Sequence, residues 1–163
     1  MVFVVRAEMD AAGVSPTAGT FTVLIRACSA AGDAGKAFEA RAEMAAAGVR
    51  PNAGTFTALI EACGTAGDLG KAIEALAEME AAGVRPNAGT FTALIQACGA
   101  AGDLGMVFVV RTEMEAAGVR PTAGTFNALI EACRAAGDPG KAFEVRAEME
   151  AAGIMPSERR RQS

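Results

Sequence analysis

The stretch GTFTALIEACGTAGD, residues 54–68, decides the fold of this 163-residue chain because the sequence repeats it. It returns almost unchanged at residues 89–103, and looser copies begin at Gly19 and Gly124. The phenylalanines of the copies are spaced by 35 residues, at Phe21, Phe56, Phe91 and Phe126. A constant period of this length is typical of arrays in which one small unit stacks on the next. We therefore treat the chain as a repeat protein.

This period divides the chain into four full units with a partial unit before them. The full units are residues 18–52, 53–87, 88–122 and 123–157. Residues 1–17 match the second half of a unit, because MVFVVRAEM at Met1 resembles MVFVVRTEM at Met106. Residues 158–163 are a tail with no counterpart in the repeat. We expect residues 1–157 to form a single array, and the chain to be a fragment of a longer one.

Each unit contains a first helical pattern that ends in a turn. In the second full unit the apolar residues follow the i, i+3, i+4, i+7 spacing of a helix with one buried face: Phe56, Leu59, Ile60 and Cys63. We expect this helix to end near Ala66, with Gly67 in a left-handed conformation. Asp68 then suits the N-cap of the following helix, because its carboxylate accepts backbone N–H groups.

The second helix of this unit is predicted over residues 69–82. It is expected to bury Ala72, Ile73, Leu76 and Met79, and to expose Glu74, Glu78 and Glu80. Gly83 ends it, and a Pro-containing turn leads to the next unit. One such hairpin has too little core to be stable alone, so its apolar faces must pack against neighbouring hairpins. The predicted fold class is an all-α solenoid of stacked helix-turn-helix hairpins.

Composition argues against several functions. The formal net charge is −4, which is not the basic excess expected of an electrostatic nucleic-acid binder. No apolar run is long enough to span a membrane, and no signal sequence opens the chain. The chain has no His and no nucleophile motif, so we expect no enzymatic activity. Acidic pairs such as Glu74 with Glu78 repeat on a stripe predicted to face solvent, which favours a solvated surface over catalysis.

The four cysteines are predicted to be core residues without a metal or a cofactor. Cys28, Cys63, Cys98 and Cys133 recur once per unit on the predicted buried stripe. Stacked helices lie about 8 to 10 Å apart, which is too far for a disulfide without backbone movement or for a shared zinc ion. Four free thiols favour a reducing compartment.

Three motifs in residues 55–87 resemble the pentatricopeptide repeat. They are TFTALI, AGDLGKA and AEMEAAGVRPN, and the likeness extends over residues 1–157. The tetratricopeptide repeat is a weaker match, because its period is 34 residues and its signature needs Trp and Tyr, which this chain lacks. The resemblance implies a right-handed superhelix whose units each bind one base of single-stranded RNA.

The resemblance also implies which side chains contact the bases. Two residues in each unit set the specificity: the one directly after the phenylalanine and the one directly after the closing proline. The first set is Thr22, Thr57, Thr92 and Asn127, and the second is Asn52, Asn87, Thr122 and Ser157. In the family, Thr with Asn prefers adenine, Thr with Thr leans to purine, and Asn with Ser leans to cytosine. The implied target is 5′-A-A-purine-C.

Two family features are missing here. The family usually has Val three residues before the first recognition residue, where it sandwiches the bases, but this chain has Gly19, Gly54, Gly89 and Gly124. A Lys late in the first helix commonly contacts phosphate, but this chain has Ala30, Thr65, Ala100 and Ala135. Because phosphate neutralisation supplies much of the affinity for nucleic acid, we expect weak binding at physiological salt.

Two alternatives therefore stay open at this point. One is a helical scaffold that binds protein, and the other is a fragment with weak RNA affinity. Uncapped end faces predict end-to-end association of chains. Family resemblance implies a role in RNA processing, stability or translation in a chloroplast or mitochondrion, although the sequence shows no transit peptide.

Overall fold

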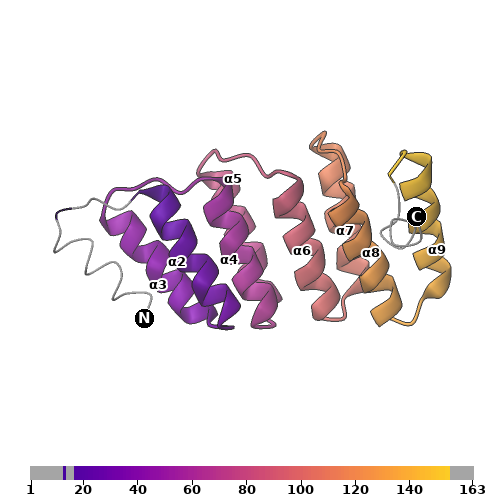
Figure 1. Ribbon diagram of the computed structural model, residues 1–163, viewed down its shortest axis with the longest axis horizontal. Coiled ribbons are helices and arrows are strands. Elements are labelled where there is room, and N and C mark those ends of the chain that lie inside the picture. The colour runs from indigo at the N-terminus through magenta and orange to yellow at the C-terminus, as the bar shows by residue number, and fades with distance from the viewer. Residues whose placement is uncertain (1–12, 14–16, 155–163) are drawn as a thin grey trace. The chain divides into compact units, whose positions relative to one another are not determined.

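The computed structural model describes residues 13 and 17–154 of the chain, and within them the regular structure is entirely α-helical (Figure 1). Each of the eight helices there has 13 residues. They are α2 (Ala18–Ala30), α3 (Ala34–Ala46), α4 (Ala53–Thr65), α5 (Leu69–Ala81), α6 (Ala88–Ala100), α7 (Leu104–Ala116), α8 (Ala123–Ala135) and α9 (Pro139–Ala151). The all-α fold class and the pairing of helices into hairpins are confirmed. The predicted half-unit before Thr17 and the tail at residues 158–163 lie outside the described residues.

The chain forms two compact units that are larger than the 35-residue repeats, residues 1–86 and 87–163. In the first unit, α2 packs against its hairpin partner α3 and against α4, and α4 packs against α5. In the second unit, α6 packs against α7 and α8, and α8 packs against α9. Each unit is thus two stacked hairpins whose first helices lie side by side. The boundary at Pro86 coincides with a predicted repeat boundary to within one residue.

The repeated apolar residues of the first helices form the core, as predicted. Phe56, Leu59, Ile60 and Cys63 are all fully buried in α4. The core also contains residues of the second helices, such as Met44 beside Phe21. The packing of first helix against first helix therefore removes the phenylalanine of each described copy from water.

One residue of the predicted core is exposed. Ala72, Leu76 and Met79 are buried in α5 as expected, but Ile73 is 40% exposed and Ala75 is buried instead. The buried face of α5 follows positions 72, 75, 76 and 79, so Ile73 lies to one side of it. The prediction for Ile73 is wrong because it assigned an apolar residue to the core by type and not by its angle around the helix.

The turns confirm the predicted capping residues to within one position. Gly67 has a φ of 74°, and Asp68 accepts a hydrogen bond from the Lys71 backbone N–H at 3.1 Å. The helices end at Thr65 and Ala81, one residue before the expected ends. Pro139 is the first residue of α9, where a missing N–H costs nothing. Local sequence therefore determines the length of each hairpin.

Replacing a buried phenylalanine tests the core. We expect Phe56→Ala to lower the free energy of unfolding by about 3–5 kcal/mol, because Phe56 is fully buried and the substitution leaves a cavity. Phe143→Ala is the matched control, since Phe143 is 68% exposed and its loss should cost less than about 0.5 kcal/mol. Urea unfolding followed by circular dichroism measures both. Equal losses would contradict this account of the core.

The four cysteines are buried free thiols, as predicted. Burial raises the pKa of Cys63 and of Cys98 from 9.0 to about 11, and the nearby carboxylates of Asp68 and Asp103 add to the shift. Burial also raises the pKa of Cys28 and Cys133. The folded state thus favours the neutral thiol.

These pKa shifts predict that stability falls at high pH. The contribution of the thiols is fully present below pH 9.0 and is lost as the pH rises towards about 11, because the unfolded chain releases its thiol protons first. We expect the urea midpoint of a Cys63→Ala, Cys98→Ala variant to fall less steeply than that of the wild type between pH 9.0 and about pH 11, the limits set by these pKa values. Parallel pH profiles would show that the thiols do not contribute.

Candidate nucleic-acid interface

The predicted recognition residues lie at the starts of the first helices. Those that follow the phenylalanine occupy the first turns of these helices and are half-buried: Thr22, Thr57, Thr92 and Asn127. Those that follow the proline are the exposed N-caps of the next first helices: Asn52, Asn87 and Thr122. Ser157 lies outside the described residues. The second residue of each described pair therefore has a structural role in capping a helix as well as its predicted role in recognition.

Each of these caps is a reciprocal capping box with a buried threonine. The Oδ1 atom of Asn52 accepts from the Thr55 backbone N–H at 3.0 Å, and the Oγ1 atom of Thr55 accepts from the Asn52 backbone N–H at 3.2 Å. Asn87 and Thr90 make the same pair of bonds at the same distances. Such boxes satisfy backbone N–H groups that have no partner within the helix. These bonds hold the Asn52 and Asn87 side chains through their Oδ1 atoms.

Thr55 also contacts Thr22, which is the predicted partner of Asn52 in base recognition. The hydroxyl oxygens of Thr22 and Thr55 are 2.9 Å apart, and that of Thr55 is 3.1 Å from Asn52 Oδ1. Thr55 is completely buried between these two side chains. The predicted pair Thr22 and Asn52 is thus brought together from α2 and from the start of α4.

The compact unit formed by residues 87–163 contains the same arrangement with a threonine as the N-cap. The hydroxyl oxygens of Thr92 and Thr125 are 2.8 Å apart, and those of Thr122 and Thr125 are 3.2 Å apart. Thr125 is also completely buried. The sequence motifs predict the pair Thr92 and Thr122, whereas Thr125 and its equivalents Thr55 and Thr90 emerge only from the structure. Their signal is the threonine three residues after each N-cap, the capping-box position.

The glycines in place of the family's base clamp border these pairs. A Cβ atom on Gly54 would lie 3.2 Å from Asn52 Oδ1 and 3.8 Å from Thr22 Cγ2. A Cβ atom on Gly124 would have more space, 3.6 Å from Thr122 Oγ1. Neither glycine has a positive φ, so the backbone of both accepts other residues. The positions are therefore next to the candidate site but contribute no side chain to it.

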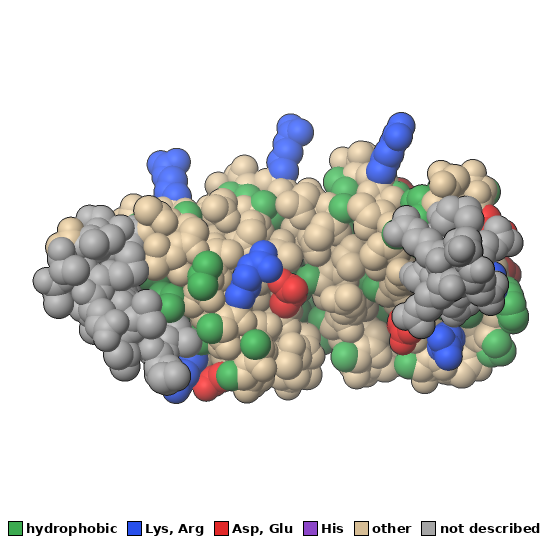
Figure 2. All heavy atoms as spheres, viewed as in Figure 1, with side chains coloured by type: hydrophobic (Ala, Val, Ile, Leu, Met, Phe, Trp, Pro, Cys, Tyr) green, Lys and Arg blue, Asp and Glu red, His purple; other side chains and the backbone are tan. Residues whose placement is uncertain are grey.

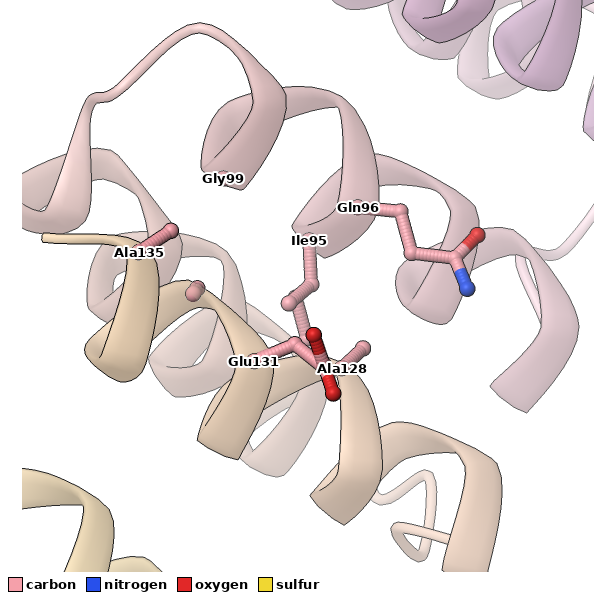
Figure 3. Close-up of a pocket in the computed structure, with 7 residues that line it drawn as sticks. Ile95, Gln96, Gly99, Ala128, Glu131 and Ala135 are labelled. Carbon is pink, nitrogen blue, oxygen red and sulfur yellow. The ribbon is translucent and has the colours of Figure 1, made fainter.

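A shallow groove lies between α6 and α8, further along the first helices (Figure 3). Its volume is about 190 Å³, and small residues such as Gly99 and Ala132 form much of its wall. Figure 3 shows Ile95 and Glu131 directed into the space between the helices, while the amide of Gln96 extends away from it. A Cβ atom on Gly99 would lie 3.1 Å from that of Ala132, so glycine permits this close approach.

Charges near the recognition residues have mixed sign. One turn after the first recognition residue, the side chains are Arg26, Glu61, Gln96 and Glu131. Three further arginines are exposed in the connections between hairpins, two residues before each second recognition residue: Arg50, Arg85 and Arg120. In each compact unit taken by itself, Figure 2 shows basic side chains that project on the side where these connections lie. These arginines were not among the predicted binding residues, although the recurring VRP motif contains them.

The second helices carry a separate set of ion pairs. Arg41 of α3 lies 3.6 Å from Glu78 of α5, and Arg111 of α7 pairs with Glu148 of α9. The Arg111 guanidinium donates a hydrogen bond to the Glu148 carboxylate, and this bond raises the pKa of Arg111. Some of the glutamates that were predicted to face solvent, such as Glu78, thus form ion pairs with a neighbouring second helix. The arginines of these pairs are largely buried and the glutamates about half exposed, so the pairs lie between the surface and the buried kind.

Other kinds of site are not evident in the described residues. Their His, Cys, Asp and Glu side chains form no group that could hold a metal ion. None of their helices is both long enough and apolar enough to cross a membrane.

The fold and this interface define a class, the helical-hairpin repeat proteins with paired polar residues between successive hairpins. A family model described as the pentacotripeptide-repeat region of PRORP matches residues 1–87 and 71–163. The chain belongs to this pentatricopeptide-repeat family, as its sequence motifs predicted. A comparison with curated protein sequences found no match.

Solved structures show the same architecture. PPR10 in complex with an 18-nt psaJ RNA element is 30% identical, with a TM-score of 0.83, over 96% of this chain and 24% of that chain. The PPR domain of Arabidopsis thaliana PRORP1 in complex with tRNA is 20% identical, with a TM-score of 0.75, over 96% of this chain and 82% of that one. Nuclear RNase P 2 (PRORP2) from A. thaliana is also 20% identical, with a TM-score of 0.67, over 90% of this chain and 33% of that one. The two likenesses at 20% identity show the fold alone, and this chain spans about a quarter of PPR10.

The cap role of Asn52 can be separated from base recognition. We expect Asn52→Ala to lower the free energy of unfolding by about 1 kcal/mol, because the Thr55 N–H loses its acceptor. Asn52→Asp should leave stability within about 0.5 kcal/mol of the wild type, since a carboxylate caps as well as an amide. Chemical denaturation measures both variants. If Asn52→Asp were as unstable as Asn52→Ala, the bond to Oδ1 would not be the stabilising one.

Proposed function

We propose that the chain binds single-stranded RNA, with one base at each pair of recognition residues. The observation that carries this proposal is the hydrogen-bonding network that brings Thr22 and Asn52, from successive hairpins, to one buried threonine. Hydroxyl and amide groups arranged in this way present donors and acceptors to the edge of an unstacked base. The 30% identical PPR10 was solved with an RNA element bound, which supports the same ligand class.

The proposed base order follows the four pairs. The pairs Thr22 with Asn52 and Thr57 with Asn87 would each bind adenine. The pair Thr92 with Thr122 would bind a purine, and Asn127 with Ser157 would bind cytosine. The resulting target is 5′-A-A-purine-C.

Phosphate contacts are proposed to come from the connections between hairpins. Arg50, Arg85 and Arg120 are exposed and lie close in sequence to the second recognition residues. They would replace part of the positive charge missing at Ala30, Thr65, Ala100 and Ala135. Because the chain carries a net charge of −4, we expect a modest affinity that falls steeply with salt.

Fluorescence anisotropy with short RNAs tests this function. The labelled RNA contains 5′-AAGC within a uridine-rich context, and the control RNA has the same composition in scrambled order. We expect the first to bind more tightly at about 50 mM salt, a concentration at which phosphate contacts are strong. Arg50→Gln with Arg85→Gln should reduce the slope of log K against log salt by about 0.7 for each phosphate that is no longer neutralised. Equal binding of the two RNAs would reject sequence recognition.

A protein ligand is the second candidate, and the acidic residues Glu61 and Glu131 favour it. Both lie on the first helices one turn from a recognition residue, where they would repel phosphate. A basic peptide would instead be attracted. Binding of an arginine-rich peptide, together with no binding of either RNA in the same assay, would support this alternative.

The remaining proposals concern the whole protein. We propose a binding module without catalysis that acts in RNA processing, stability or translation in a chloroplast or mitochondrion. Buried free thiols suit a reducing compartment. PRORP2, which has a similar fold, is described as a nuclear protein. Self-association is proposed through apolar side chains such as Val23 and Phe143, which are 66% and 68% exposed. Sedimentation over a range of protein concentrations measures it.

Restoring a clamp side chain should strengthen RNA binding. Gly124→Val places apolar atoms beside Thr122 in a position with a 3.6 Å clearance, so we expect little strain and a several-fold lower Kd. Gly140→Val is the control, because Gly140 lies in the first turn of α9, away from the recognition residues. Anisotropy with the AAGC RNA measures both variants. If both variants had the same Kd as the wild type, Gly124 would not border the bound base.

A further inference from the structure

Four oxygen atoms at the first recognition pair form a chain that is joined by three short contacts. Thr22 Oγ1 lies 2.8 Å from the Ala18 carbonyl oxygen and 2.9 Å from Thr55 Oγ1. Thr55 Oγ1 lies 3.1 Å from Asn52 Oδ1. The two hydroxyls supply only two hydrogens for these three short contacts. Only some arrangements of the hydrogens are therefore compatible with the structure.

In one arrangement, Thr22 donates to the Ala18 carbonyl and Thr55 donates to Asn52 Oδ1. Two others keep a hydrogen between the threonines: Thr22 donates to Thr55 while Thr55 donates to Asn52 Oδ1, or Thr22 donates to the Ala18 carbonyl while Thr55 donates to Thr22. In all three, the Thr22 hydrogen points into the protein and a lone pair of Thr22 remains for a ligand.

The amide of Asn52 is also held in one orientation. Its Oδ1 atom accepts from the Thr55 backbone N–H at 3.0 Å and lies near the Thr55 hydroxyl. The Nδ2 group is therefore the end that is left to donate to a ligand. Thr22 and Asn52 together offer one acceptor and one donor.

We infer that Thr55 is a positioning residue that fixes the hydrogen-bonding pattern of Thr22 and Asn52 and thereby sets which base this pair accepts. The inference rests on the proposed RNA binding and adds a third, buried residue to the pairs Thr22 with Asn52 and Thr92 with Thr122. An acceptor beside a donor matches the amino group and ring N1 of adenine. Guanine and uracil present the opposite pattern, a carbonyl oxygen and a ring N–H, and they are disfavoured.

The third pair provides an internal comparison. Thr125 takes the place of Thr55, and Thr92 again donates within the protein, to the Ala88 carbonyl at 2.7 Å or to Thr125. The cap is now Thr122, whose single hydrogen can point to Thr125 or outward. This pair has an acceptor but no fixed donor. It should therefore discriminate between bases less sharply than Thr22 with Asn52.

The experiment compares four forms of the full 163-residue chain. They are the wild type, Thr55→Val, the conservative variant Thr55→Ser, and the control Thr65→Val. Thr65 lies in the same helix, but its hydroxyl donates to the Glu61 carbonyl at 3.0 Å and is not part of the recognition network. Two quantities are measured: anisotropy with AAGC and GAGC RNAs, which differ only at the first base, and nuclear magnetic resonance of the Asn52 side-chain amide without RNA.

We expect Thr55→Val to reduce the preference for adenine over guanine at the first base by about fivefold to tenfold, the effect of one hydrogen bond. Preference at the second base should not change. Without RNA, the Asn52 amide should become more mobile in Thr55→Val only. Thr55→Ser should retain the wild-type preference and amide order, and Thr65→Val should match the wild type in both.

The outcomes separate the inference from the proposed function. If Thr55→Val weakened AAGC and GAGC equally, or left the Asn52 amide as ordered as in the wild type, Thr55 would be only a helix-capping residue and the inference would be overturned. If the wild type bound the two RNAs equally, the proposed sequence recognition would fail. The amide measurement would then still decide whether Thr55 orients Asn52.

Discussion

A single hairpin of this chain cannot bury its own apolar stripe, and the rest of the structure depends on this constraint. The first helix of each hairpin therefore packs along the first helix of another, as α2 does with α4 and α6 with α8. Small side chains such as Gly99 and Ala132 permit the close approach, and the phenylalanines between the helices are removed from water. Local helix propensity and surface ion pairs contribute little to stability, so most of it comes from the stacking of the hairpins.

The same stacking creates the candidate site. Thr22 belongs to one hairpin and Asn52 caps the first helix of the next, so the two come together only when the hairpins are in register. Thr55 joins them because it is buried at the contact and keeps hydrogen-bonding groups for both. A polar residue that is completely buried needs such partners, since burying an unpaired hydroxyl is costly. Helix capping and the proposed base recognition thus depend on the same few hydrogen bonds.

Arginines on the second helices have carboxylate partners, whereas those in the connections between hairpins are exposed. On the second helices, Arg41 and Arg111 pair with glutamates of the neighbouring hairpin. The connections before the first helices instead carry arginines that are exposed, such as Arg50. The negative net charge of the whole chain therefore does not describe these connections. A local count of charges is the better guide to whether a phosphate backbone can approach.

The sequence by itself determined the period, the helices, their caps and the buried phenylalanines, because these depend on spacings of a few residues and on local hydrogen bonds. Through family resemblance it also predicted positions for base recognition. It placed Ile73 in the core wrongly and missed Thr55 and Thr125, which only the tertiary structure identified. The contact between Thr22 and Thr55 joins residues 33 positions apart, and no local pattern encodes it. Packing of one helix against another decided which small polar side chains were buried and which of their atoms stayed available to a ligand.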